Sequence, residues 1–255
     1  MTEEDDEDEV FDDFDYFLYS NLEDIREAIL NVIQDRSVNI RNRIERVIQI
    51  GASAQRHYDE GDLVMWDETD EQDKPQIHGD HEEYMLLQKQ AMFLIEDLEL
   101  LYDDWEDVLI ESQELLFGGG EETFTENRRL FEAWWRSNCE VTGCHLGQKS
   151  DIAESVVTED NVIEGEHRMT MDIFLEQIIV YFISIYLLGA VYDDNISGKV
   201  NACVGHAVEL YMLLMARWLR NGETLSADDL IELSYRYSRE IEHSDENLEQ
   251  VEVLD

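Results

Sequence analysis

The chain has 255 residues, and its 62 acidic residues outnumber its 18 basic residues, which gives a formal net charge of −44. A surface this negative repels phosphate backbones and excludes nucleic acid as the main partner. Hydrophobic residues make up 44% of the chain, which excludes a disordered acidic polypeptide and suffices for the core of one domain or two small ones.

The acidic residues are spread over the whole chain, and lysines are few. At ~1 M salt the Debye length falls to roughly 3 Å, so surface carboxylates scarcely repel one another. The pattern is therefore typical of a halophile with a salt-filled cytoplasm; the alternative is an acidic interaction protein at ordinary salt. No basic signal-peptide start is present, and the apolar run 178–191 is short for a membrane span, so we expect a cytoplasmic protein that does not bind membranes.

The N-terminal part combines an acidic segment with two amphipathic helices. Residues 1–15 form an acidic tail that we expect to be disordered or loosely docked, and residues 16–255 form a helical domain. The first helix begins at Ser20, which can form a capping box with Glu23. The second begins near Val38, and four arginines around this junction make it the most basic part of the chain: Arg36, Arg41, Arg43 and Arg46.

The middle of the chain predicts two helices between two long loops. Residues 59–80 hold the only proline and predict a loop. Apolar residues then recur every three or four positions from Glu82 to Phe117, which predicts one long helix that the glycines at 118–120 end. A further helix is expected over the aromatic stretch 124–135, and residues 137–166 predict the second long loop.

Three helices close the chain. The first, Met169–Tyr192, is apolar on most faces and is expected to be the central buried helix. The second is Val200–Arg220, and the third begins with a capping box of Ser226 and Asp229 and ends near His243. No window alternates with the period of a strand, so we predict an all-α fold, a single irregular helical bundle of about six to eight helices.

Two groups of residues contain side chains of the types that bind metal ions. The segment His78–Glu83 joins imidazoles and carboxylates, as Zn, Mn or Fe sites do. Five further residues could supply the four ligands of a structural zinc, namely Cys139, Cys144, His145, Cys203 and His206. Solvated loop acids and small buried cysteines explain the same residues, so we predict no metal site and keep a metal-dependent helical enzyme as a third alternative.

The end of the chain groups polar side chains on one helical face. Tyr235, Arg239, Glu242 and His243 follow at i, i+4, i+7 and i+8. We expect Arg239, Glu242 and His243 to point inward as a polar pocket; the alternative is a salt bridge that locks the last helix to the bundle.

This ending resembles the C-terminal part of the flagellin lysine-N-methylase family. The resemblance rests on the run Ser238–His243 followed by Asn247 and Leu248, and extends to Glu176–Phe182, Val200–Arg220 and Asn21–Arg26. It implies transfer of methyl groups from S-adenosylmethionine to lysine side chains of flagellin. The family's N-terminal half carries a cysteine cluster that the three cysteines here do not reproduce. We therefore expect no iron–sulfur cluster in this chain, and either a fragment of a longer or split enzyme or a homologue that keeps the helical half for binding.

The resemblance also suggests roles for seven residues. As catalytic residues we select Glu242 and His243, either of which would take the lysine proton, with Arg239 and Tyr235 beside them. As cofactor-binding residues we select three on the preceding apolar helix: Glu176, Tyr181 and Tyr186. The partner is then a protein substrate. The alternative function is a non-catalytic helical interaction module, or a degenerate subunit that partners a cysteine-cluster protein.

Overall fold

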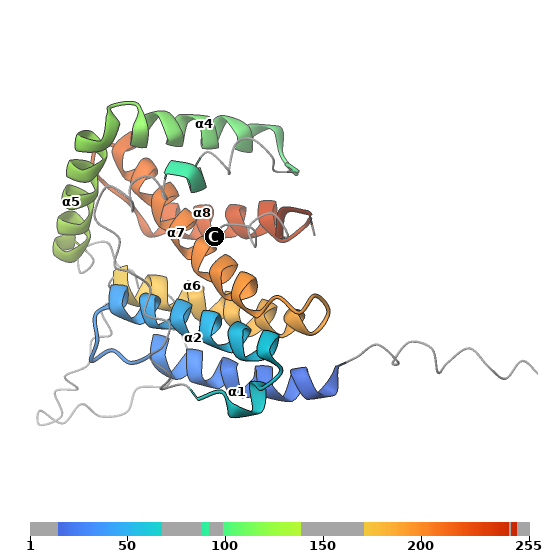
Figure 1. Ribbon diagram of the computed structural model, residues 1–255. Helices are drawn as coiled ribbons and strands as arrows, with labels where there is room; N and C mark the ends of the chain where they lie inside the picture. The colour runs from blue at the N-terminus through green and yellow to red at the C-terminus, as the bar shows by residue number, and fades with distance from the viewer. Residues whose placement is uncertain (1–14, 68–87, 92–98, 139–170, 245, 249–255) are drawn as a thin grey trace, which may run out of the picture.

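A computed structural model describes residues 15–67, 88–91, 99–138, 171–244 and 246–248 (Figure 1). The acidic segment 1–14 and most of the two predicted long loops lie outside these residues. Within them the structure has helices and no strand, which confirms the all-α prediction. The elements are α1 (Tyr16–Ile33), α2 (Ile40–Glu60), the 3-10 helix η1 (Leu63–Met65), α4 (Asp103–Phe117), α5 (Gly120–Asn138), α6 (Met171–Tyr186), the 3-10 helix η2 (Leu187–Val191), α7 (Ile196–Arg220) and α8 (Ala227–Ile241).

The central helix of the bundle is α7. It crosses the molecule diagonally and packs against α2, α6, α4, α8 and α5 (Figure 1). Most of its residues are buried, and a glycine of α2 lets the two helices come close. On the side of α2 the approach is so tight that a Cβ on Gly51 would lie 2.8 Å from Cβ of Val200. The prediction that Met169–Tyr192 is the central helix is therefore wrong, because the structure gives that place to α7.

Helix α6 is long and apolar but has an exposed side. Together with η2 it makes Met171–Val191 the one stretch of the described chain with the length and composition of a membrane span. Core helices of globular proteins meet the same criterion, and α6 packs on α7 and α1. Tyr181 and Ile185 are exposed, whereas Phe174, Ile179 and other apolar residues face the core.

Capping residues decide where the helices begin. The first helix begins at Tyr16 and not at Ser20, because the carboxylate of Asp15 accepts a hydrogen bond of 2.9 Å from the Leu18 amide and caps it there. Asn195 likewise caps α7, which begins at Ile196, four residues before the predicted start. The predicted capping box of α8 is confirmed, since Ser226 and Asp229 each bond the other's backbone amide.

The long helix predicted from Glu82 to Phe117 is interrupted. Residues 99–102 are not helical, and α4 begins at Asp103. Two side chains from the end of the chain take backbone amides that a continuous helix would use: Asn247 Oδ1 accepts from the Glu99 amide and Glu240 Oε2 from the Leu101 amide, both at 2.8 Å. This docking of the C-terminal segment is a long-range contact that helical periodicity does not reveal.

Candidate functional site

The outer edge of α8 carries three of the predicted site residues. Tyr235, Arg239 and His243 are exposed. The Arg239 guanidinium donates to the Tyr235 hydroxyl at 2.8 Å and lies 5.4 Å from the ring centre of Tyr102. Nδ1 of His243 is 3.1 Å from the Arg239 carbonyl oxygen. Of the three residues expected to point inward, only Glu242 does.

Glu242 meets two tyrosines of α6, and we call these residues with Ser238 the tyrosine–glutamate cluster. The hydroxyl groups of Tyr186 and Tyr181 donate to Glu242 Oε2 at 2.6 and 2.9 Å. On the other oxygen Glu242 accepts from the Ser238 hydroxyl. The structure thus brings together a residue selected for catalysis and two selected for cofactor binding, although they are more than 50 positions apart in the chain.

The electrostatics of this cluster keep the two phenols that contact Glu242 neutral. Burial raises the pKa of Tyr186 and of Tyr181, and the hydrogen bond of each to Glu242 raises it further. Both phenols therefore keep their protons and act as donors. Within the described part of the chain, no Lys, Arg or His forms an ion pair with Glu242. Tyr181 is 42% exposed, so this carboxylate without a counter-charge lies close to solvent.

A buried polar group lies behind the cluster. The ring of Phe182 stacks on Tyr186 and, at 4.3 Å between ring centres, on His206. Nδ1 of His206 is 2.8 Å from the Tyr237 hydroxyl, which donates to the carboxylate of Glu209. His206, Glu209 and Tyr237 are all buried, and burial raises the pKa of Tyr237 well above its ordinary value. Tyr237 thereby holds α8 to α7 and turns the helix so that Glu242 faces α6.

Sequence reasoning missed this buried group. His206 was considered only as a zinc ligand with Cys203, whereas its ring nitrogen is satisfied by Tyr237. The sequence did contain a signal for it. In the stretch that forms α7, a histidine and a glutamate three residues apart interrupt an otherwise apolar run. Such a pair requires a polar partner from another helix, because isolated buried charges are too costly.

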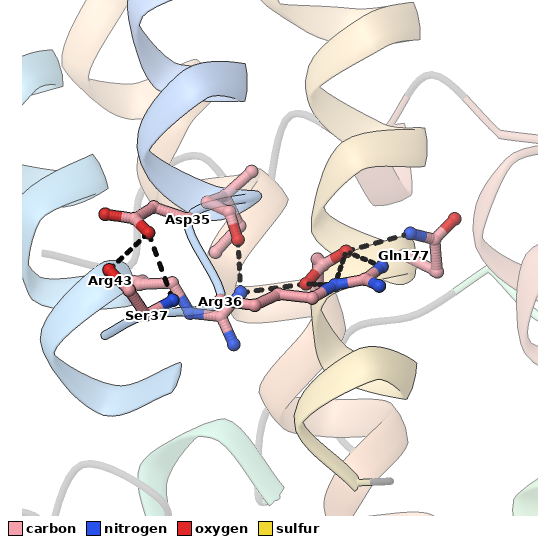
Figure 2. Close-up of polar contacts among 7 residues, drawn as sticks. Asp35, Arg36, Ser37, Arg43 and Gln177 are labelled. Carbon is pink, nitrogen blue, oxygen red and sulfur yellow. Dashed lines mark hydrogen bonds and ion pairs between the residues drawn. The ribbon is translucent and has the colours of Figure 1, made fainter. Parts of the chain in front are cut away.

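Glu176 is bound differently. Both of its oxygens accept hydrogen bonds from arginines, from Arg36 at 2.7 Å and from Arg43 at 2.8 Å (Figure 2). Burial alone would raise the pKa of Glu176, but these bonds outweigh it and hold the pKa below its ordinary value. Arg43 also donates to the Ile33 carbonyl, so the group ties α1 and α2 to α6. Two arginines of the basic junction meet here, and a cofactor contact of Glu176 stays a prediction.

A groove of about 540 Å³ lies between α4, α7 and α8. Its charged lining consists of three arginines and four carboxylates: Arg217, Arg220, Arg236, Asp104, Asp107, Glu111 and Glu232. The groove has the size of a small-ligand site, but its walls are more polar than such sites usually are. None of its lining residues was selected from the sequence.

The candidate metal ligands are mostly outside the described residues. This applies to His78–Glu83 and to Cys139, Cys144 and His145. Cys203 is buried, and the structure as described contains no group of three metal-binding side chains. The described residues thus offer no support for the metal-dependent alternative.

Comparison with known proteins adds one finding. A family model described as the FliB lysine N-methylase C-terminal domain matches residues 26–254. No curated protein and no solved structure matches the chain.

Proposed function

This chain belongs to the FliB lysine N-methylase family, and from this premise we propose that its tyrosine–glutamate cluster binds the lysine side chain of a flagellin-type protein for methylation. The resemblance noted in the C-terminal helices is confirmed by the family match. The observation that carries the proposal is Glu242, a half-buried carboxylate that two tyrosine hydroxyls orient and no described basic side chain neutralises.

The cluster has the properties that recognise an alkylammonium group. A half-buried carboxylate beside aromatic rings attracts a cation more strongly than one in bulk water, since the local dielectric constant is lower. Tyrosine rings add an attraction through their negative faces. The partial exposure of Tyr181 makes one side of the cluster accessible from the surface between α6 and α8.

Methylation requires the lysine nitrogen to lose a proton before its lone pair can form a bond to carbon. Glu242 is placed to take that proton, and Tyr186 and Tyr181 hold its carboxylate in one orientation. His243 is less suited, because its Nδ1 faces the Arg239 carbonyl on the exposed edge of α8. S-adenosylmethionine, when bound, would supply the methyl group from its sulfonium, whose sulfur–carbon bond breaks as the nitrogen–carbon bond forms and whose sulfur leaves as a neutral thioether.

Methyl transfer to a flagellin-type protein from the donor labelled in its methyl group tests this proposal. Glu242→Gln keeps the shape of the side chain and removes its charge, and we expect it to lower incorporation by about 10² or more. His243→Gln should leave most of the incorporation. Glu106→Gln, an exposed charge on α4, is the matched control. Full activity of the Glu242→Gln protein would remove Glu242 as the proton acceptor.

Measurements on the same protein preparation distinguish the proposed enzyme from the alternative, a non-catalytic binding protein. A chain that binds the lysine-bearing protein but transfers no methyl group, alone or with a cysteine-cluster partner, would retain the binding part of the proposal only. In that case Glu242→Gln should weaken binding while methyl incorporation is absent in every variant.

We include a salt-rich cytoplasm in the proposal because of the net charge of −44. Carboxylates at this density repel one another at low ionic strength and are screened at high ionic strength. The free energy of unfolding, measured by urea titration, should therefore rise steadily with KCl. A constant value between low and molar salt would contradict a halophilic origin.

A further inference from the structure

The groove between α4, α7 and α8 differs in charge from the rest of the molecule. Its lining has four carboxylates for three guanidinium groups, whereas the whole chain has 62 acidic residues for 18 basic ones. An acidic side chain is repelled by most of this protein, but much less so here. The groove thus presents guanidinium groups in a lining that is far less acidic than the protein as a whole.

Two of the three arginines are available for a ligand. Arg220 pairs with Glu111 at 3.2 Å and Arg236 with Asp104 at 3.0 Å, and the acidic partner in each pair is substantially exposed. Ion pairs in which one member is well exposed contribute less to stability than buried ones, so a ligand carboxylate can replace Glu111 and Asp104 while Arg236 stays over the Trp105 ring. Arg217 is only 12% exposed and is held by Asp229 and Glu232, and we assign it no ligand.

The groove and the tyrosine–glutamate cluster flank the same helix. Arg236 on one side of α8 reaches α4, while Glu242 on the other side reaches α6. Figure 1 shows α8 running between α4 and α6. The exposed edge between the two sites carries Arg239, which packs between the rings of Tyr102 and Tyr235.

We propose that the groove binds an acidic side chain of the same protein segment whose lysine enters the tyrosine–glutamate cluster. This inference rests on the proposed function and names a second determinant of the substrate. Arg236 and Arg220 form bidentate bonds to the carboxylate, as guanidinium groups do. The segment crosses the exposed edge of α8 over Arg239.

The geometry of α8 sets the spacing between lysine and acid. Six residues from Arg236 to Glu242 amount to about 9 Å of rise and a separation of about one third of a turn around the helix. At the radius of about 6 Å that a helix has with its side chains, this third of a turn is about 12 Å of arc, so the path over the surface is about 15 Å long. An extended segment advances about 3.3 Å per residue, and the acidic residue of the substrate therefore lies about five positions from the lysine.

Peptide binding with charge-matched variants tests the inference. The probe is a fluorescein-labelled peptide of about twelve residues with one lysine, a glutamate five positions away, and serine, glycine and alanine elsewhere. A second peptide has glutamine in place of that glutamate. Fluorescence anisotropy is measured at the lowest salt concentration at which the full chain stays folded. The variant is Arg220→Gln/Arg236→Gln, and the control is Arg129→Gln/Arg136→Gln, which removes two exposed arginines of α5.

We expect the unaltered protein to bind the glutamate peptide about tenfold tighter than the glutamine peptide. The groove variant should lose this preference and bind both peptides as the unaltered protein binds the glutamine peptide, and the control should keep it. Equal affinity of the unaltered protein for both peptides would overturn the inference. A control variant that also lost the preference for the glutamate peptide would overturn it as well. Glu242→Gln separates the two proposals: if it weakens both peptides while the groove variant changes nothing, only the groove assignment fails.

Discussion

Two glutamates selected from the sequence occupy opposite kinds of site. Glu176 is fully buried, and both of its oxygens bind arginines that lie more than 130 positions away in the chain. Glu242 is half-buried, accepts only from hydroxyl groups and has no described counter-charge. The first arrangement satisfies a charge and holds helices together, whereas the second leaves a charge that a ligand can complete.

The comparison shows how a buried carboxylate can be assigned to structure or to function. Removing one partner from a paired buried charge costs stability, because the remaining charges keep their desolvation penalty. Removing a carboxylate that has only neutral donors leaves no buried charge behind and costs less stability, and under the proposed function it weakens the binding of lysine. Substitution of the two glutamates should therefore give opposite results.

The largest expected change in stability is that of Glu176→Gln. Arg43, which is 3% exposed, would be left without its counter-charge, and the free energy of unfolding should fall by about 3 kcal/mol or more. Urea titration at high salt measures it. Glu126→Gln removes a similar pair with Arg129 that is fully exposed on α5, and should change stability little. Equal effects of the two substitutions would show that the buried group does not hold α1, α2 and α6 together.

A smaller loss is expected from Tyr237→Phe. The hydroxyl between His206 and Glu209 disappears, so two buried polar side chains lose their partner, which should cost about 1–3 kcal/mol. Tyr235→Phe, on the exposed side of the same helix, is the control and should change the urea midpoint much less. If Tyr237→Phe is as harmless as the control, the buried group does not fix the rotation of α8.

The smallest effect concerns stability at alkaline pH. The pKa of Tyr186 is raised above its ordinary value of 10.0 by burial and by Glu242. From about pH 10 upward the unfolded chain therefore loses this proton before the folded chain does, and the free energy of unfolding falls by at most about 1.4 kcal/mol per pH unit. Urea titrations between pH 8 and 11 should show a shallower decline for Tyr186→Phe than for the unaltered protein. Identical slopes would mean that the phenol is not buried against Glu242.

Local patterns predicted the helices well but not all of their ends. The Ser226–Asp229 capping box and the glycines at 118–120 act through neighbouring residues, and the structure confirms both. The break at residues 99–102 depends on Glu240 and Asn247, which are about 140 positions away. Periodicity carries no information about such contacts, and the expected helix Glu82–Phe117 was wrong for this reason.

In the candidate site, too, the sequence predicted what depends on neighbouring residues and not what depends on contacts between helices. Helical spacing placed Tyr235, Arg239 and His243 together on one side of the last helix, where the structure has them. It did not show which way Glu242 turns, because that depends on how Tyr237 docks on His206 and Glu209 of α7. No spacing in the sequence predicted that Glu242 contacts Tyr181 and Tyr186. These three residues had been selected together only because of the family resemblance.

Calorimetric titration with a lysine-bearing peptide tests the central claim most directly, because it measures recognition of the ammonium group without requiring methyl transfer. The unaltered protein and Glu106→Gln should bind the peptide with the same Kd, and Glu242→Gln should bind it at least about tenfold more weakly. A peptide with acetylated lysine, which has no charge, should bind poorly to all three. Undiminished binding of the lysine peptide to Glu242→Gln, or equal binding of both peptides, would contradict the account.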